Sequence, residues 1–274
     1  TEPAVAAGGG VIAVTAVLTQ MNLRAARAAG VGRIPQTVQR ESIRQALGSS
    51  AGGWPGDGAT GMNDEQLRIA IVSPPWFPVP PSGYGGIEWI VALLADGLAK
   101  AGHDVTLFAS GDSRTNAKLS YVFETAPSEW IGRSHFELLH TLPCYTNADE
   151  FDVISEHTGM FGIVMSGLVD TPVVHTVHGP LTGEPGAMFE ALDGLVPDLH
   201  LISISMNQRQ PKPDLPWLAN CPNALAFSVY PCKPHPGEYL LFLGRMSADK
   251  GCHRAIAVAM ELELPLKIAG KKQE

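Results

Sequence analysis

Two histidines that directly follow short apolar runs are placed where a side chain can contact a ligand. His178 follows the run 172–177 and precedes Gly179, which leaves space beside the imidazole, and His157 comes after the run 152–155. In open α/β sheets ligands bind outside the carboxyl ends of the strands. An imidazole at this edge could hydrogen-bond a hydroxyl group or another ligand oxygen. A single histidine at a strand end is more often structural, and that alternative stays open for both residues.

A second group of candidate residues lies in the segment GRMSADKG, at positions 244–251. Arg245 and Lys250 place a guanidinium group and an ammonium group between an expected strand and an expected helix. Together the two side chains could neutralise a diphosphate without a metal ion. The alternative is a pair of solvated loop charges, but the glycines at both ends of the segment favour binding. Gly244 is a further candidate for substrate contact.

The third candidate segment is the loop 74–86, which is rich in proline and glycine. Gly85 and Gly86 stand at the amino end of an expected helix, where the absence of side chains lets a ligand approach backbone N–H groups of partial positive charge. Tyr84 directly precedes them. A helix-entry turn without any ligand is the alternative. A nicotinamide cofactor is disfavoured, because the spacing is not G-x-G-x-x-G and the next strand ends without a clear ribose-binding acid.

The elements that must position these residues alternate between strand and helix. Short apolar runs predict strands at 67–73, 103–109, 119–123, 152–155, 172–177 and 200–204. Helical spacing and the gaps between strands predict helices at 87–101, 128–142, 160–167 and 185–193. Such alternation indicates βαβ units and therefore an α/β fold with a doubly wound, Rossmann-like parallel sheet. The pattern restarts with a strand at 239–243, a helix at 250–262 and a strand at 265–269.

We predict four regions along the chain. They are a flexible Ala/Gly-rich extension at 1–65, an N-terminal Rossmann-like domain at 66–207, a proline-rich linker at 208–238 and the start of a second nucleotide-fold domain at 239–274. The many prolines of the linker lack N–H groups and fix φ, which predicts an absence of regular structure there. Met62 closely precedes the first clear strand, so the natural start of the protein could lie at this residue.

Composition narrows the classes of function. Hydrophobic residues make up 45% of the 274 residues, and the formal net charge is −8 without a run of lysine or arginine, which argues against a nucleic-acid partner. The four cysteines form no C-x-x-C pair, so we expect reduced thiols and neither a zinc site nor a disulfide framework. No stretch resembles a membrane span or a secretory signal, which predicts a cytoplasmic protein. The oligomeric state is not indicated.

The ordered set of segments resembles the GT-B retaining glycosyltransferases of family 4. The resemblance covers about residues 67–270 and is carried by 68–73 with GYGG at 83–86, GLAKAGHDV at 97–105, TVHG at 176–179, ISIS at 202–205, PNA at 222–224 and the segment 244–251. One departure is Ala224, since the family usually has glycine after the asparagine.

The resemblance implies an enzyme that transfers a hexosyl group from a UDP- or GDP-sugar to an unknown acceptor with retention, without an obligatory metal or other cofactor. It implies that Arg245 and Lys250 hold the donor diphosphate, together with the glycine loop of Gly85 and Gly86 between donor and acceptor. His178 would be the catalytic residue that contacts the transferred sugar. The further substrate-binding candidates are His157, Tyr84 and Gly244.

The family's second domain is about as large as its first and carries two glutamates spaced E-x7-E. This chain ends before that region, so we expect a truncated chain with little or no transfer activity. Two alternatives remain: a non-catalytic fragment that binds a nucleotide or sugar, and a GT-B-like UDP-sugar epimerase. An epimerase would need acid/base residues of its own, which the sequence does not locate.

Overall fold

The computed structural model describes residues 66–223, 225 and 237–270. The chain divides into two compact units, Thr1–Phe227 and Ser228–Glu274. The predicted extension 1–65, with Met62, lies outside the described residues, as does most of 224–236.

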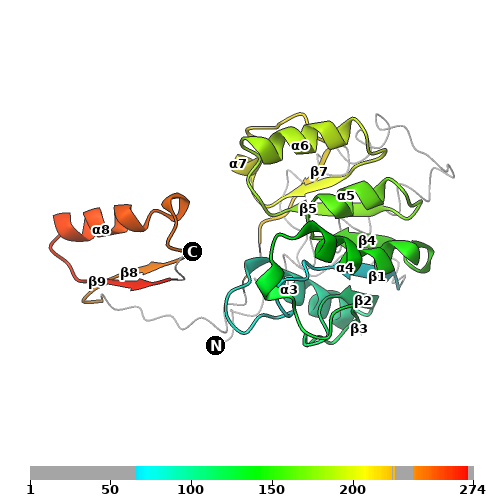
Figure 1. Ribbon diagram of the computed structural model, residues 1–274, viewed down its shortest axis with the longest axis horizontal. Helices are drawn as coiled ribbons and strands as arrows, with labels where there is room; N and C mark the ends of the chain where they lie inside the picture. The colour runs from blue at the N-terminus through cyan, green and yellow to red at the C-terminus, as the bar shows by residue number, and fades with distance from the viewer. Residues whose placement is uncertain (1–65, 224, 226–236, 271–274) are drawn as a thin grey trace, which may run out of the picture. The chain divides into compact units, whose positions relative to one another are not determined.

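The first unit is built on a seven-stranded sheet in the order β3-β2-β1-β4-β5-β6-β7 (Figure 1). All neighbouring strands are parallel. In chain order the strands are β1 (Arg68–Val72), β2 (Asp104–Phe108), β3 (Lys118–Ser120), β4 (Val153–Glu156), β5 (Val173–Val177), β6 (Leu201–Ser203) and β7 (Trp217–Asn220). This is the strand order of a Rossmann-like fold, in which the direction of winding reverses between β1 and β4. The predicted doubly wound parallel sheet is confirmed.

Helices join the strands of this unit. They are α3 (Gly86–Lys100), α4 (Ser134–Thr146), α5 (Met160–Ser166), α6 (Glu184–Asp193) and α7 (Met206–Arg209), with the short 3₁₀ helices η1 (Ser128–Trp130) and η2 (Ala148–Glu150). The prediction of one helix over 128–142 is wrong at its amino end. Gly132 adopts a φ of 83° there, in the left-handed region, and separates η1 from α4.

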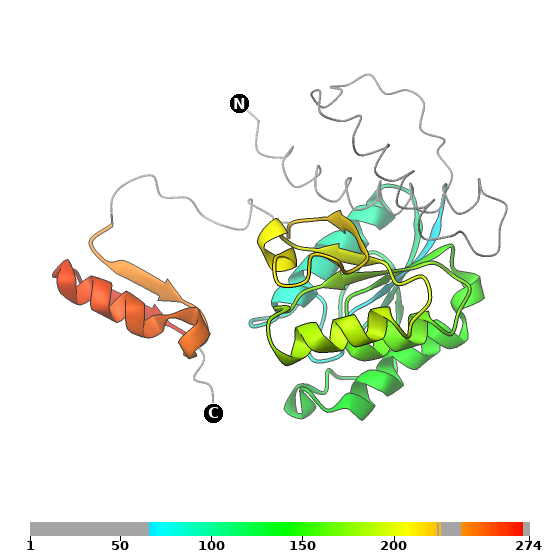
Figure 2. The ribbon, with the colours of Figure 1, turned by 90° about the horizontal axis from the view of Figure 1, so that it is seen from above.

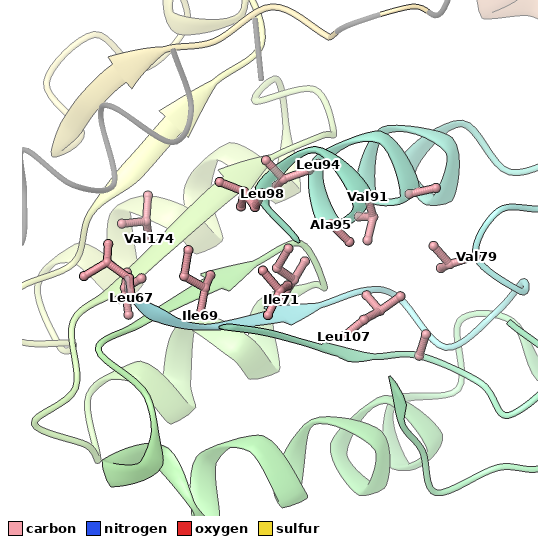
Figure 3. Close-up of a cluster of buried hydrophobic side chains, with 14 of the residues drawn as sticks. Leu67, Ile69, Ile71, Val79, Val91, Leu94, Ala95, Leu98, Leu107 and Val174 are labelled. Atoms are coloured by element: carbon pink, nitrogen blue, oxygen red, sulfur yellow. The ribbon is translucent and has the colours of Figure 1, made fainter. Parts of the chain in front are cut away.

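The sheet is covered on both faces, as the continuous apolar runs of its strands require. Successive residues of β1 point to opposite layers: Ile69 and Ile71 pack with the helix α3, whereas Ala70 and Val72 pack with Cys144 of α4. Figure 3 shows α3 lying over the strands, with its apolar side chains directed at β1 and β2. Figures 1 and 2 show α4, α5 and α6 together on the other face.

The predicted linker 208–238 is partly wrong, because it contains a strand of the sheet. β7 pairs with β6 in parallel and extends the first domain beyond residue 207. Its four residues include no proline, and an edge strand needs hydrogen bonds on one side only. Pro216, just before the strand, lacks an N–H but accepts a bond from the Leu201 N–H at 3.1 Å. Proline density therefore did not exclude a strand at the sheet edge.

The second unit contains a parallel pair of strands, β8 (Leu240–Leu243) and β9 (Leu266–Ala269). Between them come η4 (Ala248–Lys250) and α8 (Cys252–Glu261). Gly251 separates the two helices with a φ of 74°, a left-handed conformation that glycine adopts without strain. The predicted strand–helix–strand restart is confirmed in this unit.

Candidate functional site

A cavity of about 430 Å³ opens at the point where the winding of the first sheet reverses. Its walls come from the loop after β1, the first turn of α3, the residues after β4 and the residues after β5. Four of the predicted residues line it, namely Tyr84, Gly86, His157 and His178. Open α/β folds bind their ligands at this edge, so the topology and the cavity agree on the location of a site.

His157 and His178 lie side by side because β4 and β5 are neighbours and each histidine directly follows its strand. His157 Nδ1 is 3.0 Å from His178 Nε2, and His157 Nε2 is 3.0 Å from Ser155 Oγ. The two rings are stacked, with their centroids 5.3 Å apart. These contacts form one hydrogen-bonded chain from Ser155 to His178, and they fix the orientation of the His178 ring at the cavity.

Burial keeps these imidazoles neutral. It lowers the pKa of His178 to about 4. The pKa of His157 is held well below its ordinary value, first by burial and then by the neighbouring histidines. A neutral ring with one nitrogen engaged keeps the other for a ligand, and His178 Nδ1 makes no hydrogen bond to a described residue. The arrangement suits a neutral hydrogen-bonding partner for a hydroxyl group.

Gln208 fixes the backbone on both sides of His178. Its amide nitrogen donates to the carbonyl oxygens of Val177 and Gly179, both at 2.8 Å, and its amide oxygen accepts from the Ile204 N–H at 2.9 Å. The predicted linker 208–238 includes Gln208, so the sequence did not indicate that this side chain holds the backbone around His178. The pattern S-x-x-Q at 205–208 could have indicated it, because a serine followed by glutamine three residues later is typical of a helix start. Ser205 indeed caps α7 by accepting from the Gln208 N–H.

Gly85 is required by the loop that leads into α3. Its φ is 148°, and an added Cβ would lie 2.8 Å from Pro81 and 2.9 Å from a Glu88 carboxyl oxygen. Gly86 has open space where a Cβ would stand, so the backbone does not demand glycine there. We predicted that backbone N–H groups at this helix start are open to a ligand. The structure adds a feature that we did not predict, the Glu88 carboxyl beside Gly85. Tyr84 lies half exposed at the cavity rim, edge-to-face with Phe77 at 5.6 Å.

Two further glutamates near the cavity were not predicted. Glu137, from α4, lines the cavity and accepts from the Gly159 N–H at 2.5 Å. Glu156, at the end of β4, is fully buried, and it accepts bonds from Tyr145 Oη at 2.8 Å and the Thr158 N–H at 2.7 Å. Burial raises the pKa of Glu156 to about 7. Glu156 thus ties α4 to the loop that carries His157.

The predicted cations lie in the second unit, after β8. Arg245 and Lys250 both approach one carboxylate oxygen of Asp249, at 3.7 and 3.9 Å. The Asp249 pKa is lowered by its polar surroundings, first by the Ser247 side chain and then by Arg245 among other causes. Both cations are substantially exposed, and Gly244 precedes Arg245 at the end of the strand. Arg245 and Lys250 therefore share Asp249 as an ion-pair partner, and their predicted role in holding a diphosphate stays a prediction.

The comparison with known families agrees with the position of the cavity. Residues 84–219 match the model of Glycosyltransferase Family 4. The chain carries a glycosyltransferase family 4 domain. The matched range includes Tyr84, His157 and His178, and it ends within β7. The family 4 match therefore covers α3, β4 and β5 at the cavity, whereas β1 and the lining residues Pro74, Trp76 and Phe77 precede it. No curated protein matches the chain.

Two other properties of the family 4 chain concern the described residues only. Within 66–223, 225 and 237–270, no three histidine, cysteine, aspartate or glutamate side chains are grouped as a metal site. None of the helices in these ranges is both long and apolar enough to cross a bilayer.

Proposed function

We propose that the protein transfers a hexosyl group from a UDP- or GDP-sugar to an acceptor hydroxyl with retention of configuration. In this reaction the bond between the anomeric carbon and the diphosphate oxygen breaks, and its electron pair leaves with the nucleoside diphosphate. The acceptor oxygen forms the new bond on the same face of the sugar, and its proton passes to the departing diphosphate. No oxidation takes place, and the proposed mechanism uses no metal ion.

The observation that carries this proposal is the neutral, oriented His178 in a cavity of a family 4 domain. His178 would hydrogen-bond the transferred sugar, since Gln208 and His157 hold its position. His157, Tyr84 and Gly244 are proposed to contact the substrates. Gly85 and Gly86 would lie between donor and acceptor.

We assign the stabilisation of negative charge on the departing diphosphate to Arg245 and Lys250. Both side chains meet Asp249 only at long distances and remain accessible, so a diphosphate can replace that carboxylate as their partner. Cations positioned where negative charge develops are an effective form of electrostatic catalysis. Arg245 and Lys250 are proposed to stabilise the leaving group in this way.

The test is a transfer assay on the full-length gene product with a panel of UDP- and GDP-hexoses and mixed acceptors. We expect release of UDP or GDP together with a new glycoside, whose anomeric configuration by NMR equals that of the donor. His178→Ala should reduce kcat by one to two orders of magnitude, about 1.4 to 2.8 kcal/mol. His135→Ala, at an exposed position of α4, is the matched control and should behave as wild type.

Other results would identify a different activity. Conversion of one UDP-sugar into another without an acceptor would indicate an epimerase. Binding of UDP or GDP in calorimetry, with no turnover of any nucleotide sugar by the folded protein, would indicate a binding module and count against the transferase.

A further inference from the structure

The charged side chains that line the cavity of the first unit are all of one sign. Glu88 and Glu137 line it, while none of its described lining residues is a lysine or arginine. The histidines at the cavity do not balance them, because burial lowers the pKa of His175 to about 3 and that of His178 to about 4. Among the described residues neither glutamate has an ion-pair partner. A ligand in this cavity therefore meets carboxyl groups without a compensating cation from the same wall.

Glu88 is the more deeply buried of the two carboxyls that line the cavity. Its side chain is only 4% exposed, and its sole hydrogen bond within the described chain is to its own backbone N–H. Burial with so little hydrogen bonding disfavours the charged form of the carboxyl and raises the Glu88 pKa to about 7. A hydroxyl or ammonium group entering the cavity would supply a second donor.

The same carboxyl also obstructs an anion. A Glu88 oxygen lies next to Gly85, since a Cβ added at Gly85 would come within 2.9 Å of it. The N–H groups at the start of α3 would otherwise attract a phosphate or carboxylate. With a carboxyl already beside this helix end, a second anion would meet like charge.

One wall of the cavity is aromatic. Trp76, Phe77 and Tyr84 follow β1 and line the cavity, and the rings of Phe77 and Tyr84 are in contact. Cavities that combine apolar ring surfaces with a few fixed polar groups bind compact ligands with a defined orientation. A pyranose ring has this character, because its C–H faces are apolar and its hydroxyl groups lie around the edge.

We propose that the acceptor portion held in this cavity is a sugar ring without negative charge, either neutral or amino-substituted, with Glu88 accepting a hydrogen bond from it. This inference rests on the proposed transferase function and specifies its acceptor class. Uronic acids and sugar phosphates are excluded as the ring held there. Glu137 and the aromatic wall complete the selection of a hydroxylated ring.

The first experiment measures binding, independent of turnover. Calorimetry on the full-length protein, saturated with UDP or GDP, compares three matched sets of methyl hexosides, methyl 2-amino-2-deoxyhexosides and methyl hexuronides of gluco, galacto and manno configuration. We expect at least one neutral or amino sugar to bind at least about tenfold more tightly than its uronide. Equal or tighter binding of the uronides overturns the proposal, and so does an absence of binding in all three sets.

The second experiment assigns the selection to Glu88. Glu88→Gln keeps the size of the side chain and removes its charge. The ratio of the affinity for the neutral sugar to the affinity for its uronide should therefore fall by at least about threefold. Glu150→Gln is the matched control, since Glu150 is exposed in η2 before β4, away from the carboxyl ends of the strands, and it should keep the wild-type ratio. An unchanged ratio in folded Glu88→Gln protein overturns the role of this residue.

The dependence on pH sharpens the assignment. Deprotonation of Glu88 around pH 7 should increase the rejection of uronides between pH 6 and 8, whereas Glu88→Gln should show a flatter profile. The other titratable groups around the cavity are Glu137, whose pKa burial raises, and His157, His175 and His178, which stay neutral throughout this range. Transfer to uronides with the wild-type protein would overturn the acceptor class while leaving the transferase function intact. Failure of every nucleotide sugar to react would remove the transferase function, and the calorimetry would still decide whether the cavity selects by charge.

Discussion

The two units hold their candidate functional groups in opposite ways. In the first unit His157 is 3% exposed and is hydrogen-bonded at both ring nitrogens. In the second unit the Arg245 and Lys250 side chains are 38% and 50% exposed, and the described contacts of their charged ends are ion pairs of 3.7 and 3.9 Å to Asp249. One set of groups is fixed by burial and the other is left free to rearrange.

The difference follows from the two sheets. Seven parallel strands with helices on both faces can bury polar residues at the strand ends. The described part of the second unit has two strands and packs α8 against them, and Leu241 and Leu243 are 59% and 80% exposed. Burial gives the polar groups of the first unit a preset geometry, as the proposed contact with a sugar requires, whereas the exposed cations of the second unit can rearrange around the proposed diphosphate. The comparison predicts that changes in the second unit affect activity alone, and that changes in the first unit also affect stability.

The largest expected effect is on catalysis in the second unit. Arg245→Ala should lower kcat for sugar transfer by about 10² to 10³, because losing one group that stabilises developing charge has an effect of this size. The melting temperature should stay within about 1 °C of wild type, since exposed ion pairs contribute little to stability. Steady-state kinetics and calorimetric melting measure both quantities, with Arg254→Ala as the control at an exposed site of α8. A large loss of stability in Arg245→Ala would break the contrast between the units.

The second effect is acid destabilisation of the first unit. Four buried histidines there have lowered folded pKa values: burial lowers those of His140 and His178 from 6.5 to about 4 and that of His175 to about 3, and it holds the pKa of His157 well below 6.5. Histidines with lowered folded pKa values contribute stability that is present above pH 6.5 and lost as the pH falls. Glu88 and Glu156 act in the opposite sense, because their pKa values rise from 4.5 to about 7. Between pH 6.5 and 4.5 the unfolded chain therefore binds about two more protons, and the free energy of unfolding should fall by about 2 to 3 kcal/mol per pH unit.

Urea unfolding at pH 6.5 and 5.5, followed by tryptophan fluorescence, measures this slope. All five tryptophans precede residue 228, so the signal comes from the first unit. His140→Gln can preserve the contact with the Ser73 carbonyl and should flatten the slope by about one proton, or about 1.4 kcal/mol per pH unit. The control His135→Gln removes an exposed histidine and should leave the slope unchanged. A stability that rises on acidification would contradict the prediction.

The third effect is steric and separates packing from charge. A Cβ added at Gly162 in α5 would lie 2.6 Å from Glu156 Oε2, inside a fully buried contact. Gly162→Ala should therefore lower the free energy of unfolding by about 1 to 3 kcal/mol. Gly194→Ala is the matched control, because its added Cβ would meet only Ala191 O at 3.6 Å. Equal stabilities of the two variants in urea would show that the contact between α5 and Glu156 is looser than described.

The smallest effect concerns orientation in the first unit. Gln208→Ala leaves the carbonyl groups on both sides of His178 without their donor, and we expect a decrease of about tenfold in kcat with little change in the donor KM. Gln210→Ala, at an exposed neighbouring position, should retain wild-type kinetics. A rise in KM at constant kcat would instead assign Gln208 to ground-state binding.

Much of the framework could be predicted from the sequence. Apolar runs such as 67–73 identify strands buried on both faces, because a parallel sheet covered by helices leaves no polar face. The order of strands and helices then places the residues after each strand at one edge, which is why His157 and His178 were found. Gly85 was predicted on another ground, the access of a ligand to backbone N–H groups, whereas the structure shows that its φ of 148° and close neighbours require glycine there.

Other features depended on contacts between distant parts of the chain. Gln208 reaches the Val177 carbonyl across 31 positions, and β7 exists because β6 offers it a free edge. Glu88 reads in the sequence as an ordinary acid in the first turn of a helix, and only the tertiary structure shows that its carboxyl is buried beside the loop of Gly85. Local patterns determine which residues form strands and helices, because backbone geometry and side-chain burial act within a few residues. Tertiary structure alone decides which polar groups are buried and which have hydrogen-bond partners. Both properties depend on contacts between elements that are distant in the sequence.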